Sequence, residues 1–181
     1  MKKTILILSL ATFTSSLFAQ IKSTTSATVT FDATTSKDAL PKAENKTAVG
    51  EINTKTGEIG FEAAVKNFAF TNPMIQDHFN GEKWMNSAKF PLFTFSGKIA
   101  DLSKVKFDKA GKYAVNVSGN LTVKDIAKPI RATAIIEVKN GTLVASTSFT
   151  IKLSDYSISG QPIDNGKVAP EPKIVVTAEL K

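Results

Sequence analysis

The side chains that could carry catalysis are few. The chain has 181 residues, no cysteine and a single histidine, His78, which follows Asp77. An imidazole beside a carboxylate could transfer a proton or orient a ligand headgroup, because imidazole titrates near neutral pH. Adjacent residues of a helix point in different directions, however, and one histidine does not make a metal site. We therefore expect His78 to support a local helical segment, with contact to a ligand headgroup as the functional alternative.

No hydrolytic site is indicated either. The chain has no Gly-x-Ser-x-Gly motif, and a serine–histidine–acid triad would have to use His78 without any supporting motif. Paired carboxylates could act on a glycosidic bond, but nothing in the sequence places two acids together. The acids considered for such a pair are Glu58, Glu62, Asp101 and Asp155. We predict that the protein is not an enzyme and holds no metal or cofactor.

The first residues have the pattern of a secretory signal peptide. Two lysines precede an apolar stretch, which is interrupted by polar residues from Thr12 onward, and the small Ala19 suits a cleavage site. A membrane-spanning helix would need about 20 apolar residues, and this stretch is interrupted too early. We predict a signal peptide over 1–19, cleaved after Ala19, and one domain over 20–181 that is periplasmic or secreted.

The charge of the chain is modest and basic. Its formal net charge is +7 at pH 7, of which two charges belong to the signal peptide. Lysines without a dense cluster favour solubility and weak attraction to anionic surfaces rather than a defined site. Because the chain is also expected to be exported, we predict no nucleic-acid partner.

From Gln20 onward the sequence alternates between apolar and polar residues, which is typical of half-buried antiparallel strands. Asn140-Gly141 is the strongest hairpin signal, since a type I′ turn needs a positive φ at both central residues. At Asn67 the alternation changes phase, which predicts a bulge or bend. The eight predicted strands cover residues 28–33, 48–52, 59–65, 93–99, 113–123, 130–138, 143–153 and 174–180.

One short helical segment interrupts the strands. Asn72 can cap it, Pro73 suits its first position, and Asn80-Gly81 ends it. A second turn is expected over 82–85. The long connection over 161–172 is rich in proline and should contain no strand.

Eight antiparallel strands can form a sandwich or a closed barrel. The interior of an eight-stranded barrel has room for side chains or for one small ligand. An outer-membrane barrel would need girdles of Trp and Tyr, of which the chain has three in total. Lys66, Lys98 and Lys152 lie opposite the apolar positions, which favours a soluble barrel that does not span a membrane.

Two stretches of the chain carry recognisable motifs. The first runs over 74–95 and includes Phe79-Asn80-Gly81 and Phe90-Pro91, and the second runs over 113–124 and continues to Lys128-Pro129. Both resemble the YceI-like family of exported proteins. The resemblance implies a lipocalin-like barrel with an apolar tunnel that holds a polyisoprenoid or a related amphiphile. Many members carry Arg-Asp where this chain has Gln76-Asp77, so no residue is carried over to the polar end of the ligand.

We therefore expect an all-β fold, an eight-stranded antiparallel lipocalin-like barrel with one short helical segment, that binds, carries or stores an isoprenoid or similar amphiphilic lipid. The alternative is a filled barrel that acts as a structural or protein-interaction module in the cell envelope. The sequence leaves a homodimer open. The candidate ligand-binding residues are Phe61, Phe68, Phe70, Phe79, Phe90, Phe93 and Phe95 in the tunnel wall, Trp84 and Met85 at its mouth or in a plug, and His78.

For each of these phenylalanines, plain core packing is the competing interpretation. Arg131, the only arginine, could pair with a phosphate through two parallel hydrogen bonds. Its position alternates with Ile130 and Ala132, however, which favours a solvated strand face.

Overall fold

The computed structural model describes residues 20–181, and the predicted signal peptide over 1–19 lies outside the described residues. Strands make up most of the described chain. They are β1 (Ile21–Asp32), β2 (Lys42–Asn53), β3 (Glu58–Ala64), β4 (Ala69–Phe70), β5 (Leu92–Ile99), β6 (Gly111–Val123), β7 (Ile126–Lys139), β8 (Thr142–Thr150) and β9 (Lys173–Leu180).

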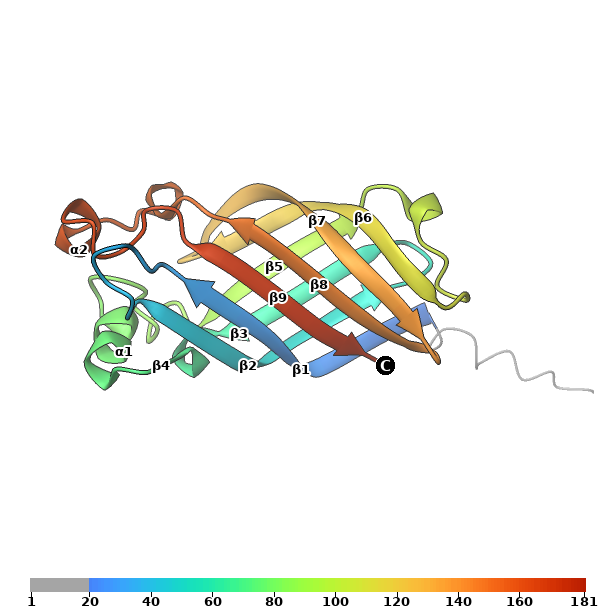
Figure 1. Cartoon of the computed structure of the whole chain (residues 1–181), viewed down its shortest axis with the longest axis horizontal. Helices are drawn as coiled ribbons and strands as arrows, with labels where there is room; N and C mark the ends of the chain where they lie inside the picture. The colour runs from blue at the N-terminus through green and yellow to red at the C-terminus, as the bar shows by residue number, and fades with distance from the viewer. Residues whose placement is uncertain (1–19) are drawn as a thin grey trace, which may run out of the picture.

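The strands close into an elongated antiparallel barrel (Figure 1). Their order is β1-β9-β8-β7-β6-β5-β3-β2, and β1 also pairs with β2, which closes the sheet on itself. The two-residue strand β4 adds to β2 outside this ring, where Phe70 pairs with Ala43. Eight long strands therefore form the barrel, which confirms the predicted fold class and excludes the sandwich.

Alternation along the strands decides which side chains enter the barrel. In β6, Val115 is 2% exposed while its neighbours on either side are exposed, as a period of two requires. The predicted hairpin at Asn140-Gly141 is present, with φ angles of 49° and 79° that define the expected turn. A second tight hairpin joins β6 to β7 through Lys124 and Asp125, whose φ angles are also positive at 50° and 60°.

One end of the barrel carries the helices α1 (Pro73–Asn80) and α2 (Gln161–Asp164), and we call it the helical end (Figure 1). Helix α1 starts as predicted, because the Asn72 side chain accepts a hydrogen bond from the Met74 backbone N–H at 2.9 Å. The short helix α2 and the 3-10 turn η4 (Leu153–Tyr156) lie in the connection from β8 to β9. Among the described residues, no helix is long and apolar enough to cross a membrane.

Several strand boundaries differ from the sequence prediction, among them the starts of β1 at Ile21 rather than residue 28 and of β7 at Ile126 rather than residue 130. Strand β2 starts at Lys42 rather than near residue 48, because the register with β1 shifts between Ala27 and Val29 and hides the alternation in its first half. Strand β8 ends at Thr150, before the chain turns into η4. The bend expected at Asn67 is the 3-10 turn η2 (Val65–Asn67), and 161–172 contains no strand.

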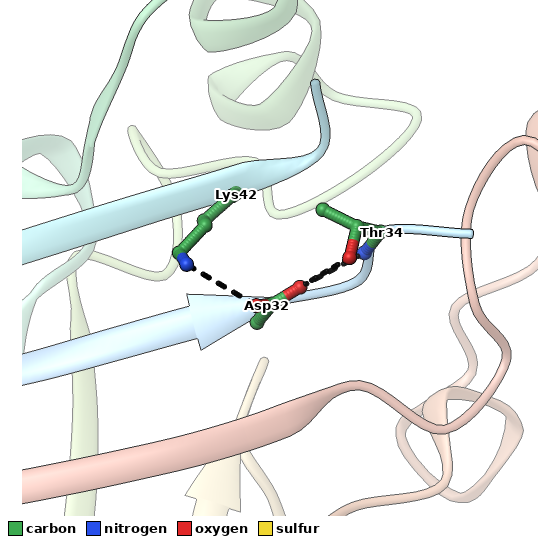
Figure 2. Close-up of polar contacts among 3 residues, drawn as sticks. All are labelled: Asp32, Thr34 and Lys42. Atoms are coloured by element: carbon green, nitrogen blue, oxygen red, sulfur yellow. Dashed lines mark hydrogen bonds and ion pairs between the residues drawn. The ribbon is translucent and has the colours of Figure 1, made fainter. Parts of the chain in front are cut away.

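The junction of β1 and β2 at the helical end is fixed by polar contacts (Figure 2). The Asp32 carboxylate accepts hydrogen bonds from the Thr34 hydroxyl at 2.7 Å and the Thr34 backbone N–H at 3.1 Å. The Lys42 ammonium lies 3.4 Å from the same carboxylate. The Thr34 hydroxyl above all, and then the Thr34 amide and Lys42, lower the pKa of Asp32 against an opposing effect of partial burial.

Candidate functional site: the barrel interior

The interior of the barrel contains a cavity of about 170 Å³. All eight long strands contribute to its wall, together with Phe68, Phe79 and Met85 from the segment that connects β3 to β5. The wall is almost entirely apolar, and Glu62, whose side chain is exposed, is the one ionisable residue in it. An engineered apolar cavity of roughly 150 Å³ stays dry and binds small apolar molecules, so a cavity of this size and lining suits an apolar ligand.

Small side chains leave the space that the cavity occupies. Ala145 of β8 pairs with Ala178 of β9, and both face the interior. On the other side of the barrel, Phe61 of β3 pairs with Phe95 of β5. At this level of the barrel, the large rings of Phe61 and Phe95 therefore stand opposite the small side chains of Ala145 and Ala178, which leaves space between them. The lining alanines are Ala48, Ala63, Ala132, Ala134, Ala145 and Ala178.

Two of the phenylalanine rings lie against glycines. A Cβ atom added to Gly97 would stand 2.5 Å from the Phe95 Cζ, and one added to Gly119, its partner across β5 and β6, would stand 2.7 Å from it. The Phe61 ring covers Gly50 of β2 in the same way. The missing side chains let these rings lie flat on the wall, so they leave the centre of the barrel open.

Phenylalanines also form a cluster at the helical end. The Phe79 ring from α1 lies 5.0 Å from the Phe70 ring and 5.9 Å from the Phe31 ring, measured between centroids. Phe68 continues the cluster to Phe93, with 5.6 Å between the ring centroids. Phe79 is 5% exposed, so its burial fastens α1 to the barrel.

Six of the ten candidate residues from the sequence lie together in the cavity wall: Phe61, Phe68, Phe79, Met85, Phe93 and Phe95. The structure places the other four elsewhere. Phe70 packs on Phe79 outside the wall, and Trp84 packs against the core without lining the cavity. Phe90 is half-buried, with the Lys89 ammonium 5.1 Å from its ring centroid. His78 is exposed on α1.

Sequence reasoning missed much of the aliphatic wall and two of its phenylalanines. Phe31 and Phe149 line the cavity, and both occupy inward positions of the strand alternation. The alternation alone would have included them, whereas the prediction concentrated on the segment from residue 61 to residue 95. Leu121, Ile130 and Ile174 are aliphatic lining residues that the same rule would have found.

Titratable groups are sparse around the interior. Tyr156 of η4 is 2% exposed and belongs to the same buried core as the lining residues Leu153 and Ile158. Burial, and to a lesser degree the negative charge of Asp155, raise the pKa of the Tyr156 phenol. Among the described residues, no group of three or more His, Cys, Asp or Glu could hold a metal ion. The chemistry that this interior offers is the burial of an apolar chain.

A closed eight-stranded antiparallel barrel with an apolar internal cavity defines a protein of the lipocalin-like class. The family model of the YceI-like domain matches residues 10–180. The chain therefore belongs to the YceI-like family, as the sequence resemblance indicated. No curated protein sequence matches it.

Solved structures share the fold at low sequence identity. A polyisoprenoid binding domain from Saccharophagus degradans, implicated in plant cell wall breakdown, aligns with a TM-score of 0.75 and 13% identity over 90% of this chain and 98% of that one. BcnA from Burkholderia cenocepacia aligns with a TM-score of 0.70 and 20% identity over 86% and 96% of the two chains. A YceI protein from Campylobacter jejuni aligns with a TM-score of 0.54 and 21% identity over 75% and 81%.

Proposed function

We propose that the protein binds the hydrocarbon chain of an isoprenoid or a similar amphiphile inside its barrel and performs no chemistry on it. The observation that carries this proposal is the apolar cavity, whose wall combines phenylalanines on β3 and β5 with alanines on β7, β8 and β9. Membership of the YceI-like family and the fold shared with a polyisoprenoid binding domain support the same ligand class.

The energetics favour such a ligand. Burial of one methylene group stabilises a complex by about 0.8 kcal/mol, so a five-carbon isoprene unit contributes roughly 3 kcal/mol before the entropy of immobilisation is subtracted. Branched methyl groups fit a space between flat rings on one side of the barrel and small side chains on the other. Phe61, Phe95 and Ala145 provide such surfaces in this cavity.

The proposed place of action is outside the cytoplasm. The pattern of residues 1–19 supports export, and an exported barrel could carry an isoprenoid between membranes or store it in the periplasm or outside the cell. Amino-terminal sequencing of the mature protein tests this part. A protein that starts at Gln20 supports it, and one that keeps residue 1 contradicts it.

The ligand itself is tested by native mass spectrometry on mature protein purified without detergent from the compartment where it accumulates, followed by lipid extraction. We expect a stoichiometric prenyl species. The variant Phe95→Glu places a carboxylate in the wall and should abolish it, whereas Ser96→Glu, a matched change at the neighbouring exposed position, should leave it intact.

Circular dichroism must first show that both variants keep the β structure of the parent. A protein that is reproducibly empty, and that also takes up no farnesol when this prenyl alcohol is offered, would contradict the proposal. That result would favour the alternative function, a structural or protein-interaction module that binds a protein partner.

A further inference from the structure

The ladder between β7 and β8 ends partway along the barrel. Its last pair is Ala134 with Thr147, and no pair follows toward the helical end. From there the two strands follow different neighbours (Figure 1), because 126–133 stays paired with β6 while 148–150 stays paired with β9. We call this interruption the lateral split, bounded by 126–133 on one side and by 148–152 on the other.

A comparable interruption between β2 and β3 is sealed by side chains. Asn45 is fully buried there, and its amide donates a hydrogen bond to the Ala64 carbonyl at 2.9 Å. Asn67 donates another to the Thr47 hydroxyl at 2.7 Å. In the described part of the chain, the lateral split has no such seal beyond its first residue, where the Thr147 hydroxyl donates to the Thr133 carbonyl at 2.9 Å.

The cavity reaches the lateral split. Its wall includes Ile130 and Ala132 on one side and Phe149 and Ile151 on the other. All four are partly exposed, whereas Ile136, in the paired part of β7, is 1% exposed. Solvent therefore reaches inward-facing side chains where the two strands separate.

The rim of the lateral split is cationic. The two bounding segments contain Lys128, Arg131 and Lys152 and no acidic residue. Arg131 and Lys152 are exposed and occupy the outward positions next to lining residues. None of the three cations takes part in an ion pair with the described residues.

We propose that the lateral split is the entrance through which the ligand chain reaches the cavity, and that the ligand carries an anionic headgroup held at the outer rim by Arg131 and Lys152. This inference rests on the proposed function. The outward direction of Arg131, which argues against a role inside the barrel, suits a headgroup that stays outside. Its guanidinium can hold a phosphate or carboxylate through two parallel hydrogen bonds. The unpaired edges of β7 and β8 offer backbone groups beside it.

The headgroup is tested by comparing three ligands with the same chain: farnesol, farnesyl monophosphate and farnesoic acid. We expect the double variant Arg131→Gln/Lys152→Gln to weaken binding of at least one anionic ligand about tenfold, which is the effect of one lost charged hydrogen bond, and to leave farnesol unchanged. The comparison between the two anions separates a phosphate from a carboxylate preference. The matched control Lys98→Gln/Lys139→Gln removes two exposed lysines elsewhere and should change neither class.

The entrance is tested with pairs of introduced cysteines. The chain has no cysteine of its own, so the linker reacts with the introduced pair alone. In Arg131→Cys/Thr150→Cys, a short bismaleimide joins the two sides of the lateral split. Association of uncharged farnesol should then slow about tenfold or more relative to the same variant before linking. The control pair Lys139→Cys/Thr142→Cys joins β7 and β8 where they are already paired and should leave the rate unchanged.

The inference is overturned if the link leaves the farnesol association rate unchanged, or if the charge variant weakens farnesol and both anions equally. Failure of the parent protein to bind any of the three ligands is a different result. It would contradict the proposed function itself.

Discussion

Replacement of a lining alanine by leucine separates an open cavity from a filled core. Ala145 faces the cavity and pairs with another alanine, Ala178. The change Ala145→Leu adds three carbon atoms to a space of about 170 Å³. If these carbons are fully buried, they increase the free energy of unfolding by up to about 2 kcal/mol, at roughly 0.8 kcal/mol for each carbon.

The matched control is Ala27→Leu. Ala27 is fully buried in β1 but does not line the cavity, so the same three carbons have no space to enter. Overpacking of this kind lowers the free energy of unfolding by about 1–3 kcal/mol. The two substitutions therefore differ in the sign of their effect.

Urea denaturation followed by circular dichroism measures both changes, and a titration with farnesol measures capacity. We expect Ala145→Leu to be as stable as the parent or more so, and to bind the prenyl alcohol more weakly because part of the cavity is filled. Equal destabilisation by Ala145→Leu and Ala27→Leu would refute the reasoning, because the interior would then have no usable space.

Three further predictions concern the parts that shape and close the barrel. Phe79→Ala should either lower the free energy of unfolding by about 3 kcal/mol or unfold α1 alone. Hydrogen exchange of the α1 amides distinguishes this local unfolding from global unfolding. Gly97→Ala should lower the free energy of unfolding by about 1–3 kcal/mol, because its Cβ would stand 2.5 Å from both the Phe95 ring and the Ser118 carbonyl oxygen of β6, and urea denaturation measures this. The lowered pKa of Asp32 means that its carboxylate stabilises the fold above the pKa of the unfolded chain and that this stability is lost as the pH falls. Asp32→Asn should therefore lower the free energy of unfolding by about 1 kcal/mol at pH 7 and by progressively less below about pH 4. Urea denaturation at a series of pH values measures this, and a difference that stays constant with pH would contradict the assignment.

The strands and the barrel could be predicted because their signals are local. Each strand shows a period of two in its own sequence. The hairpin at Asn140-Gly141 follows because only a few residue types readily adopt the positive φ angles that its turn needs. The start of α1 was equally predictable, since Asn72 and Pro73 supply the cap and the first helical position. These features depend on a few neighbouring residues, so they can be predicted without knowing how the rest of the chain folds.

The hairpin at Lys124 and Asp125 shows where local signals fail. Asp125 readily takes a positive φ angle, but Lys124 does not, so the turn depends on the pairing of β6 with β7 along their whole length. The early start of β2 was missed for a related reason. Its alternation is broken near the buried Asn45, whose side chain replaces a ladder hydrogen bond.

The resemblance implied an apolar tunnel, but the shape of the cavity and the lateral split could not be predicted from the strands one by one, because both depend on how distant strands meet. Phe61 and Ala145 are equally good core residues when each strand is considered alone. Only the closed strand order places the phenylalanines of β3 and β5 on one side of the barrel and the alanines of β8 and β9 on another. Arg131 is exposed, as predicted, but its position beside the separation of β7 from β8 could not be read from its own strand.

The most direct measurement of the central claim is a nuclear Overhauser experiment between isotope-labelled protein and unlabelled farnesol. We predict contacts from the methyl groups of the prenyl chain to the Phe61 and Phe95 rings and to Ala145, all of which line the cavity. Contacts only to exposed residues such as Met74, which is 65% exposed, would show that the alcohol binds the surface and would contradict the account.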